Sequence, residues 1–212
     1  LRARPDDRIL LAPGVYELTS VASPTIRLPS GVDLIGPSWG QAVITRSAAT
    51  SNAHRASGAL LGTSGGDTII QNVHFVGVPS DIGRRETAIN LSSLSGAGVV
   101  PLRARVYRCR FDGFATGLNL QGAGNYSYVY GCSFDRCDEA VFAGHPGRFH
   151  ECEFRGADGE RAFWASPYEG VVRITSCVFL GEPGSTLYEA LYGSLDEVTL
   201  SGNVFHGARP PQ

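Results

Sequence analysis

The segment Ser127-Tyr-Val-Tyr-Gly-Cys-Ser-Phe134 recurs along the chain and decides how the chain folds. Similar segments lie before and after it, and each ends in a phenylalanine 20 to 36 residues from the next. These phenylalanines are Phe75, Phe111, Phe134, Phe154, Phe179 and Phe205. A period of this length is typical of a solenoid, in which each repeat forms one coil and packs against its neighbours. The chain is therefore predicted to be a repeat protein.

Two further columns of residues accompany the phenylalanines. The positions two residues earlier hold Val73, Cys109, Cys132, Cys152, Cys177 and Asn203. The positions five residues earlier hold Ile70, Val106, Val129, Phe149, Ile174 and Leu200. Apart from Asn203, which we take as a mark of the last coil, both columns are apolar, as expected for strands stacked about 4.8 Å apart around one core. A straight strand cannot keep positions three residues apart on one face, so we expect a bend between the columns. The expected bend positions are Asn72, Arg108, Gly131, Glu151, Ser176 and Gly202.

A second type of strand follows four of these phenylalanines. Its alternating pattern spans Thr87–Leu91, Thr116–Leu120, Glu139–Ala143 and Arg161–Ala165. This alternation predicts that Ile89, Leu118, Val141 and Phe163 point inward. No segment keeps a helical period, and 27 of the 212 residues are glycine, so helical repeats are disfavoured. Shorter strands are expected at 9–11, 32–35 and 43–45, between Pro/Gly turns.

Length and composition limit the possible architectures and partners. We expect one domain over 1–212, with 1–5 as the possible end of an amphipathic capping helix and 208–212 as a tail. The net charge of −2 gives no general attraction to nucleic acid, and no apolar run is as long as a membrane span. Four of the five cysteines fall in the inward column and Cys137 in a turn. Free thiols are expected, because stacked columns point the Cβ atoms the same way, and no cysteine pair has zinc-ligand spacing.

Three features together resemble a known family. They are the segments Asp7-Arg-Ile-Leu-Leu-Ala-Pro-Gly-Val-Tyr16 and Ile26-Arg-Leu-Pro-Ser-Gly-Val-Asp-Leu-Ile-Gly36, followed by coils that end in Cys-x-Phe. They resemble the right-handed parallel β-helix proteins of the pectin-lyase-like superfamily. The resemblance implies an all-β fold, a right-handed parallel β-helix of about eight coils. The superfamily includes lyases, hydrolases, epimerases, adhesins and tail-spike proteins, so the resemblance leaves the reaction open. We expect an exported protein, extracellular, periplasmic or on the cell surface.

Outward positions of the repeated strand carry the candidate binding residues. The expected surface contains Arg105, Tyr107, Tyr128, Tyr130, Arg148, His150 and Arg173, with His145 and Tyr168 in the turns leading into it and Trp164 exposed on the other strand. Guanidinium groups bind carboxylates through paired hydrogen bonds, and aromatic rings stack on the apolar faces of sugars. The pattern predicts a polysaccharide partner, of anionic type.

A lyase reaction on such a polymer would use three kinds of group. Arg148 or Arg173 is expected to neutralise the uronate carboxylate, His150 or His145 to take the proton beside it, and Tyr130 to protonate the leaving oxygen. No metal ligand or cofactor is assigned, although Ca²⁺ is possible. The chain has no lysine, which lyases of this superfamily often use, and it lacks their Trp-Ile-Asp-His type of signature.

Two alternatives remain open from the sequence. Arg148 and Arg173 could instead pair with Glu151 and Glu153 on a flat, soluble sheet face, which describes a non-catalytic binding, adhesion or structural module. A glycoside hydrolase could use stacked carboxylates such as Asp112 and Asp135, which could also hold Ca²⁺. A groove closed by the loops 47–58 and 78–101 would favour an enzyme. The oligomeric state is left open.

Overall fold

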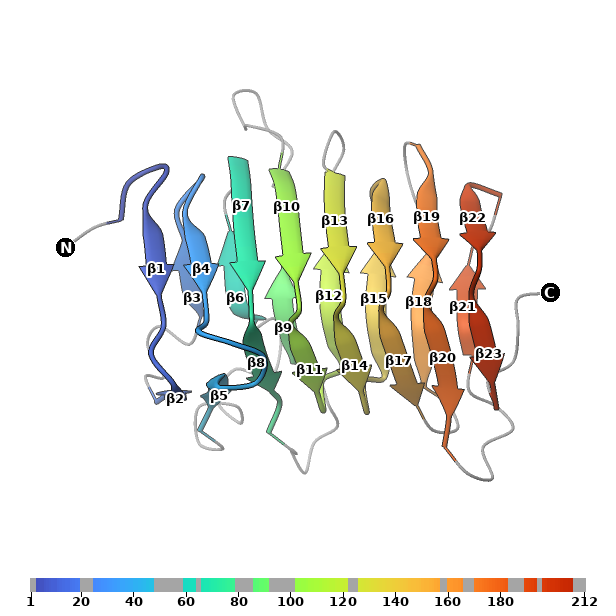
Figure 1. Cartoon of the computed structure of the whole chain (residues 1–212), viewed down its shortest axis with the longest axis horizontal. Helices are drawn as coiled ribbons and strands as arrows, with labels where there is room; N and C mark the ends of the chain where they lie inside the picture. The colour runs from blue at the N-terminus through green and yellow to red at the C-terminus, as the bar shows by residue number, and fades with distance from the viewer. Residues whose placement is uncertain are drawn as a thin grey trace.

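The fold is seen in a computed structural model, which describes residues 3–19, 25–47, 59–63, 66–78, 86–91, 102–121, 126–156, 160–165, 170–182, 189–193 and 196–207. Within this part of the chain there are 23 strands and no helix. The strands wind into successive coils that stack along one axis, with the first coil at one end and the last at the other (Figure 1). The predicted solenoid is confirmed.

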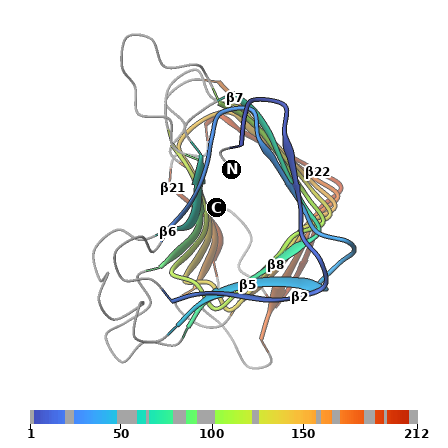
Figure 2. The ribbon, with the colours of Figure 1, turned by 90° about the vertical axis from the view of Figure 1, so that its left-hand side faces the viewer.

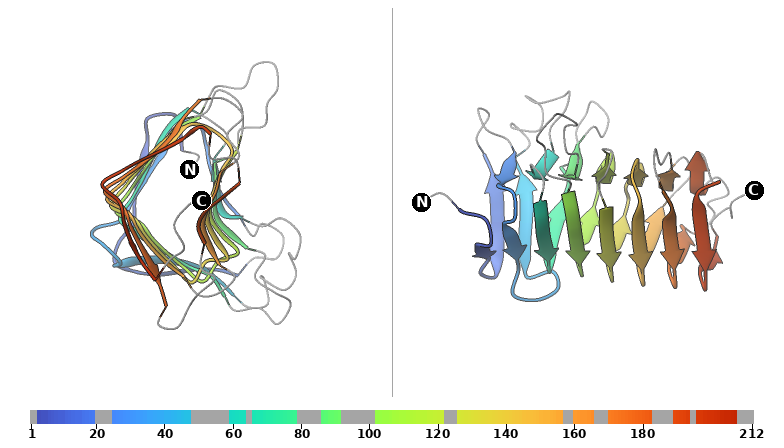
Figure 3. Two further views of the ribbon diagram at one scale, coloured as in Figure 1. Left: turned by 90° about the vertical axis from the view of Figure 1, so that its right-hand side faces the viewer. Right: turned by 90° about the horizontal axis from the view of Figure 1, so that it is seen from above.

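Three parallel sheets run along the solenoid, one on each side of the coil (Figures 2 and 3). Sheet A contains β1 (Arg8–Leu10), β4 (Asp33–Ile35), β7 (Gly66–Gln71), β10 (Leu102–Tyr107), β13 (Tyr126–Tyr130), β16 (Gly147–His150), β19 (Val172–Thr175) and β22 (Val198–Ser201). Sheet B contains β2 (Gly14–Leu18), β5 (Ala42–Arg46), β8 (Val73–Val76), β11 (Arg110–Asp112), β14 (Ser133–Asp135), β17 (Glu153–Gly156), β20 (Val178–Gly181) and β23 (Val204–His206). Sheet C contains β3 (Ile26–Leu28), β6 (Ala59–Thr63), β9 (Thr87–Asn90), β12 (Thr116–Leu120), β15 (Glu139–Ala143), β18 (Arg161–Ala165) and β21 (Glu189–Gly193). Eight strands in each of sheets A and B agree with the expected number of coils.

The predicted bend forms the corner between sheets A and B. All six expected bend residues have positive φ, from 48° to 64°. Their backbone N–H groups keep the ladder running through the corner; that of Glu151, for example, donates to the carbonyl of Thr175 at 3.2 Å. Such a left-handed residue lets one strand end and the next begin without a loop. It turns the chain so that positions three residues apart both face the core.

The inward columns fill the core as the sequence predicts. The six phenylalanines form a continuous stack in sheet B with ring centroids 4.6 to 5.4 Å apart. Ile89, Leu118, Val141 and Phe163 are fully buried under sheet C. All five cysteines are free thiols, as expected. Cys137 lies between β14 and β15, in the turn where it was predicted, with its side chain buried, and burial raises the pKa of this thiol to about 12.

Differences from the sequence-based expectations lie mainly at the first coils. The first strand is Arg8–Leu10 rather than 9–11, and the strand expected at 43–45 is longer, Ala42–Arg46. Residues 3–7 are not helical, and the N–H of Asp7 donates to the carbonyl of Arg4 at 3.1 Å. Most of the loops expected at 47–58 and 78–101, and the tail at 208–212, fall outside the described residues. In the described part of the chain no helix has the length and apolarity to cross a membrane.

Candidate functional site

The outer surface of sheet A brings most of the predicted site residues into two adjacent rows. Strand register places Arg105, Tyr128, Arg148 and Arg173 in one row, called here the arginine row. It places Tyr107, Tyr130, His150 and Thr175 in the next, called here the tyrosine row. Neighbours in a row sit on successive coils, about 4.8 Å apart. The rows therefore run along the solenoid axis.

Arg148 and Arg173 are exposed direct neighbours in this register. Neither forms an ion pair with a described residue, whereas Arg105 lies 3.8 Å from Asp67. Like charges opposite each other on a sheet repel and destabilise it. Two adjacent guanidinium groups with no carboxylate between them therefore form a local site of positive charge.

The carboxylates expected to pair with these two arginines have other partners. Glu153 contacts Arg155 at 3.1 Å, and Glu151 lies 3.3 Å from Nε2 of His150. The pairing of Arg148 and Arg173 with Glu151 and Glu153 is thus wrong. Glu151 occupies the corner with φ of 52°, and Glu153 follows in sheet B, so neither side chain lies on the outer surface of sheet A between the arginines.

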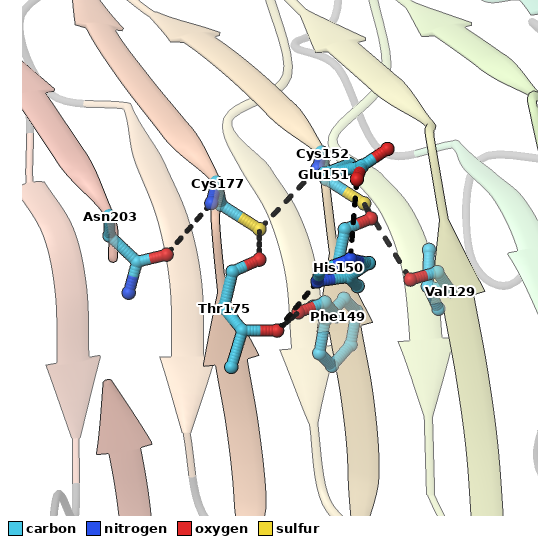
Figure 4. Close-up of polar contacts among 8 residues, drawn as sticks. All are labelled: Val129, Phe149, His150, Glu151, Cys152, Thr175, Cys177 and Asn203. Carbon is cyan, nitrogen blue, oxygen red and sulfur yellow. Dashed lines mark hydrogen bonds and ion pairs between the residues drawn. The ribbon is translucent and has the colours of Figure 1, made fainter. Parts of the chain in front are cut away.

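His150 is held on both sides by protein groups (Figure 4). Its Nδ1 lies 2.8 Å from Oγ1 of Thr175 on the next coil, and that hydroxyl also reaches the carbonyl of Phe149 at 3.4 Å. Its Nε2 faces Glu151. Both ring nitrogens therefore already have polar neighbours, and proton abstraction by His150 requires one of these contacts to open.

Tyr130 completes a cluster with His150 and Glu151. The two rings stack with centroids 5.6 Å apart and an interplanar angle of 25°. A hydrogen bond from the Tyr130 hydroxyl to Glu151, together with the negative charge of that carboxylate, raises the pKa of Tyr130. The phenol therefore keeps its proton, and it has to leave Glu151 before it can donate that proton to another group. Glu151 was missed as a site residue because the sequence marks it as a bend position and as a possible partner of the arginines, and neither reading places it beside Tyr130.

Among the other predicted residues, His145 does not join this surface. His145 is 1% exposed, with Nε2 lying 2.9 Å from the buried hydroxyl of Ser127, so its predicted contact with a polymer does not fit its place in the core. Burial lowers the pKa of His145 to about 4. Tyr168 lies outside the described residues. Tyr107 and Tyr128 do lie on sheet A, where their rings meet edge to face with centroids 5.9 Å apart.

Trp164 belongs to sheet C, on another side of the coil. Its ring packs edge to face between Phe142 at 5.1 Å and Tyr192 at 6.1 Å. Beside this row Arg161 contacts Glu189 at 3.0 Å and Glu139 at 3.7 Å, with its guanidinium 4.1 Å from the Tyr192 ring centroid. Because Arg161 already has two carboxylate partners, it adds no unpaired positive charge to this face.

The proposed carboxylate pair has the expected register, since Asp112 and Asp135 are neighbours on successive coils. However, Oδ1 of Asp112 accepts a hydrogen bond from Arg136 at 2.6 Å. Asp112 therefore has a structural role in pairing with Arg136. Because its carboxylate is already engaged, the hydrolase alternative is weakened. Among the described residues no group of three His, Cys, Asp or Glu side chains is placed to hold a metal ion. The involvement of Ca²⁺ stays a prediction.

Comparison with known proteins supports the architecture. No protein-family model and no curated protein sequence matches the chain. Among solved structures, a mutant of the PL6 family alginate lyase AlyGC aligns over 99% of this chain with a TM-score of 0.67 and 14% identity. A pectin methylesterase in complex with a hexasaccharide aligns over 97% with a TM-score of 0.54 and 12% identity. The fold is a right-handed parallel β-helix of the pectin-lyase-like type.

These alignments differ in how much of each known β-helix they include. The chain spans 34% of the alginate lyase and 73% of the pectin methylesterase. At these identities the likeness concerns the fold, and the function has to be argued from the site itself.

Proposed function

We propose that this β-helix acts on an acidic polysaccharide at the outer surface of sheet A, by β-elimination. The observation that carries the proposal is the adjacent pair Arg148 and Arg173, exposed and without an ion pair to a described residue. Each guanidinium can donate two parallel hydrogen bonds to a carboxylate. Their spacing of one coil along the axis allows successive units of one extended chain to be bound.

The cluster beside the arginines offers the groups for proton transfer. Arg148 or Arg173 would neutralise the carboxylate of the reacting uronate, which makes the proton on the adjacent carbon easier to remove. His150 would take this proton once its contact with Glu151 opens, and the electron pair would form the new double bond as the glycosidic oxygen leaves. Tyr130 would give its proton to that oxygen, and the proton on His150 would then restore the phenol.

A non-catalytic binding module is the second candidate. It is favoured by the contacts that already engage both nitrogens of His150. In this case the arginine row would bind the polymer and the Tyr130 cluster would only order the surface. The two candidates share the substrate class and differ in whether a bond is cleaved.

The test is the ultraviolet absorbance of unsaturated uronides during incubation with pectate, alginate and glycosaminoglycans, with and without Ca²⁺. The first candidate predicts a rise on one polymer that Tyr130→Phe or His150→Ala abolishes while the melting temperature is kept. Tyr126→Phe, an exposed tyrosine at the start of the same strand, is the matched control and should keep full activity. Absence of both absorbance and new reducing ends on every polymer would contradict the lyase and leave the binding module.

A further inference from the structure

A groove lies on the outer surface of sheet B, around the corner from the arginine row. It has a volume of about 420 Å³, within the range of roughly 300 to 1,000 Å³ that small-ligand sites occupy. Its lining includes Trp39, Arg110, Ser133, Asp135, Glu153 and Arg155. Nothing in the proposed reaction uses these residues, so the groove needs its own explanation.

Trp39 reaches this groove from a distant part of the sequence. It lies on the connection between β4 and β5 (residues 36–41), which stands out from the corner between sheets A and B (Figure 2, blue). Its side chain is 49% exposed. A tryptophan held half exposed against a polar floor offers an apolar ring next to hydrogen-bonding groups. That combination matches a sugar, which has an apolar ring face and a rim of hydroxyl groups.

The floor of the groove presents both a donor and an acceptor. Strand register places Arg110 beside Ser133, and Asp135 beside Arg155. Arg155 contacts Glu153 at 3.1 Å, whereas neither Arg110 nor Asp135 forms an ion pair with a described residue. A guanidinium donates to hydroxyl oxygens and a carboxylate accepts from hydroxyl groups. Arg110 and Asp135 can therefore bind a polyol from two sides.

The charge of the groove favours a different kind of ligand from the one proposed for sheet A. Its carboxylates are Asp135, Glu151 and Glu153, and its guanidinium groups are Arg110 and Arg155. Three negative and two positive charges leave a formal charge of −1, so a chain of uronates gains nothing from entering. An uncharged sugar avoids this repulsion and uses both the donors and the acceptors.

We propose that this groove binds an uncharged saccharide, with Trp39 stacking on the sugar ring and Arg110 and Asp135 holding its hydroxyl groups. The groove shares only Glu151 with the cluster proposed to react on sheet A. It would give the protein a second carbohydrate-binding site, on sheet B rather than sheet A, for an uncharged ligand rather than an acidic one.

Isothermal titration calorimetry with hexasaccharides of glucose, mannose and galactose tests the proposal. At least one of the three is expected to bind, with the affinity falling at least tenfold in Trp39→Ala and in Asp135→Asn. Ser38→Ala, on the same connection, is the matched control and should leave the affinity unchanged. Circular dichroism should show native spectra for all three variants, since the replaced side chains are not buried.

The same titration distinguishes this site from the arginine row. Binding of the neutral hexasaccharide should persist in Arg148→Ala/Arg173→Ala, whatever that variant does to acidic polymers. Failure of all three hexasaccharides to bind would overturn the proposal, as would an affinity that Trp39→Ala and Asp135→Asn leave unchanged. Loss of neutral binding in the double arginine variant alone would also overturn it, because the sugar would then lie on sheet A.

Discussion

Asn203 forms two hydrogen bonds with the preceding coil, which contains Cys177. A cysteine in the same column forms the equivalent two bonds with the coil that precedes it. Oδ1 of Asn203 accepts from the N–H of Cys177 at 2.8 Å, and its Nδ2 donates to the carbonyl of Ile174 at 2.9 Å (Figure 4 shows the first). Three coils earlier, Sγ of Cys132 accepts from the N–H of Cys109 at 3.4 Å and donates to the carbonyl of Val106 at 3.5 Å. Cysteine and asparagine are therefore equivalent in this column, and Asn203 continues the ladder rather than only marking its end.

This equivalence predicts which substitutions the ladder tolerates. Cys132→Val keeps an apolar side chain, like Val73 in the same column, but leaves the buried N–H of Cys109 without its acceptor, which should lower the free energy of unfolding by about 1–3 kcal/mol. Cys132→Asn restores an acceptor and should lose less. Urea denaturation of the two variants compares them directly. Equal midpoints for Cys132→Val and the parent protein would show that the thiol serves only as a filler.

The buried His145 predicts a loss of stability in mild acid. Its pKa is about 4 in the folded chain against 6.5 for the free group, so the unfolded chain binds the proton more readily between these values. The contribution of neutral His145 to the free energy of unfolding should be fully present above pH 6.5 and be lost as the pH falls toward 4. At 1.36 kcal/mol per pH unit, the loss amounts to about 3 kcal/mol. Urea midpoints measured across this window give the slope. In His145→Gln the slope should be shallower, and an unchanged slope would assign the acid sensitivity to other groups.

The phenylalanine stack predicts a gradient of stability along the solenoid. Phe154 is fully buried between Phe134 and Phe179, with ring centroids 4.9 and 5.0 Å away. Phe154→Ala should cost about 3–5 kcal/mol, as is usual for a buried phenylalanine. Phe205, in the last described strand of sheet B, has one stacked neighbour and is only partly buried, so Phe205→Ala should cost clearly less. Thermal unfolding of the two variants measures the difference, and equal losses would contradict a core that weakens toward its last coil.

Much of the fold was predictable because the core residues repeat. The phenylalanines and the bend positions recur at fixed offsets, and stacking converts each offset into a column. The bends could be located even where the residue is Arg108 or Glu151, neither of which favours positive φ. Periodicity made the prediction there, since residue preference alone would have indicated bends at Asn72, Gly131 and Gly202.

The site was less predictable because its contacts depend on the corner and the turns. Glu151 looks like a sheet-face charge in the sequence, yet the left-handed corner directs it to His150 and Tyr130. His145 looks like a turn residue with an exposed imidazole, and its burial follows from packing that no local pattern encodes. Trp39 does not belong to any of the repeated segments. Only the folded connection between β4 and β5 brings it to the groove on sheet B.

The central claim is that Arg148 and Arg173 recognise an acidic polymer, and the direct test is the dissociation constant of oligouronate hexasaccharides at low salt. Hexamers of guluronate, mannuronate and galacturonate are titrated against the parent protein and Arg148→Ala/Arg173→Ala. A matched control, Arg8→Ala/Arg27→Ala, removes the same charge at exposed positions in the first coils. The account predicts binding of at least one hexamer, weakened at least tenfold in the first double variant and little changed in the control. Equal affinities in the two double variants, or no binding of any hexamer to the parent protein, would contradict it.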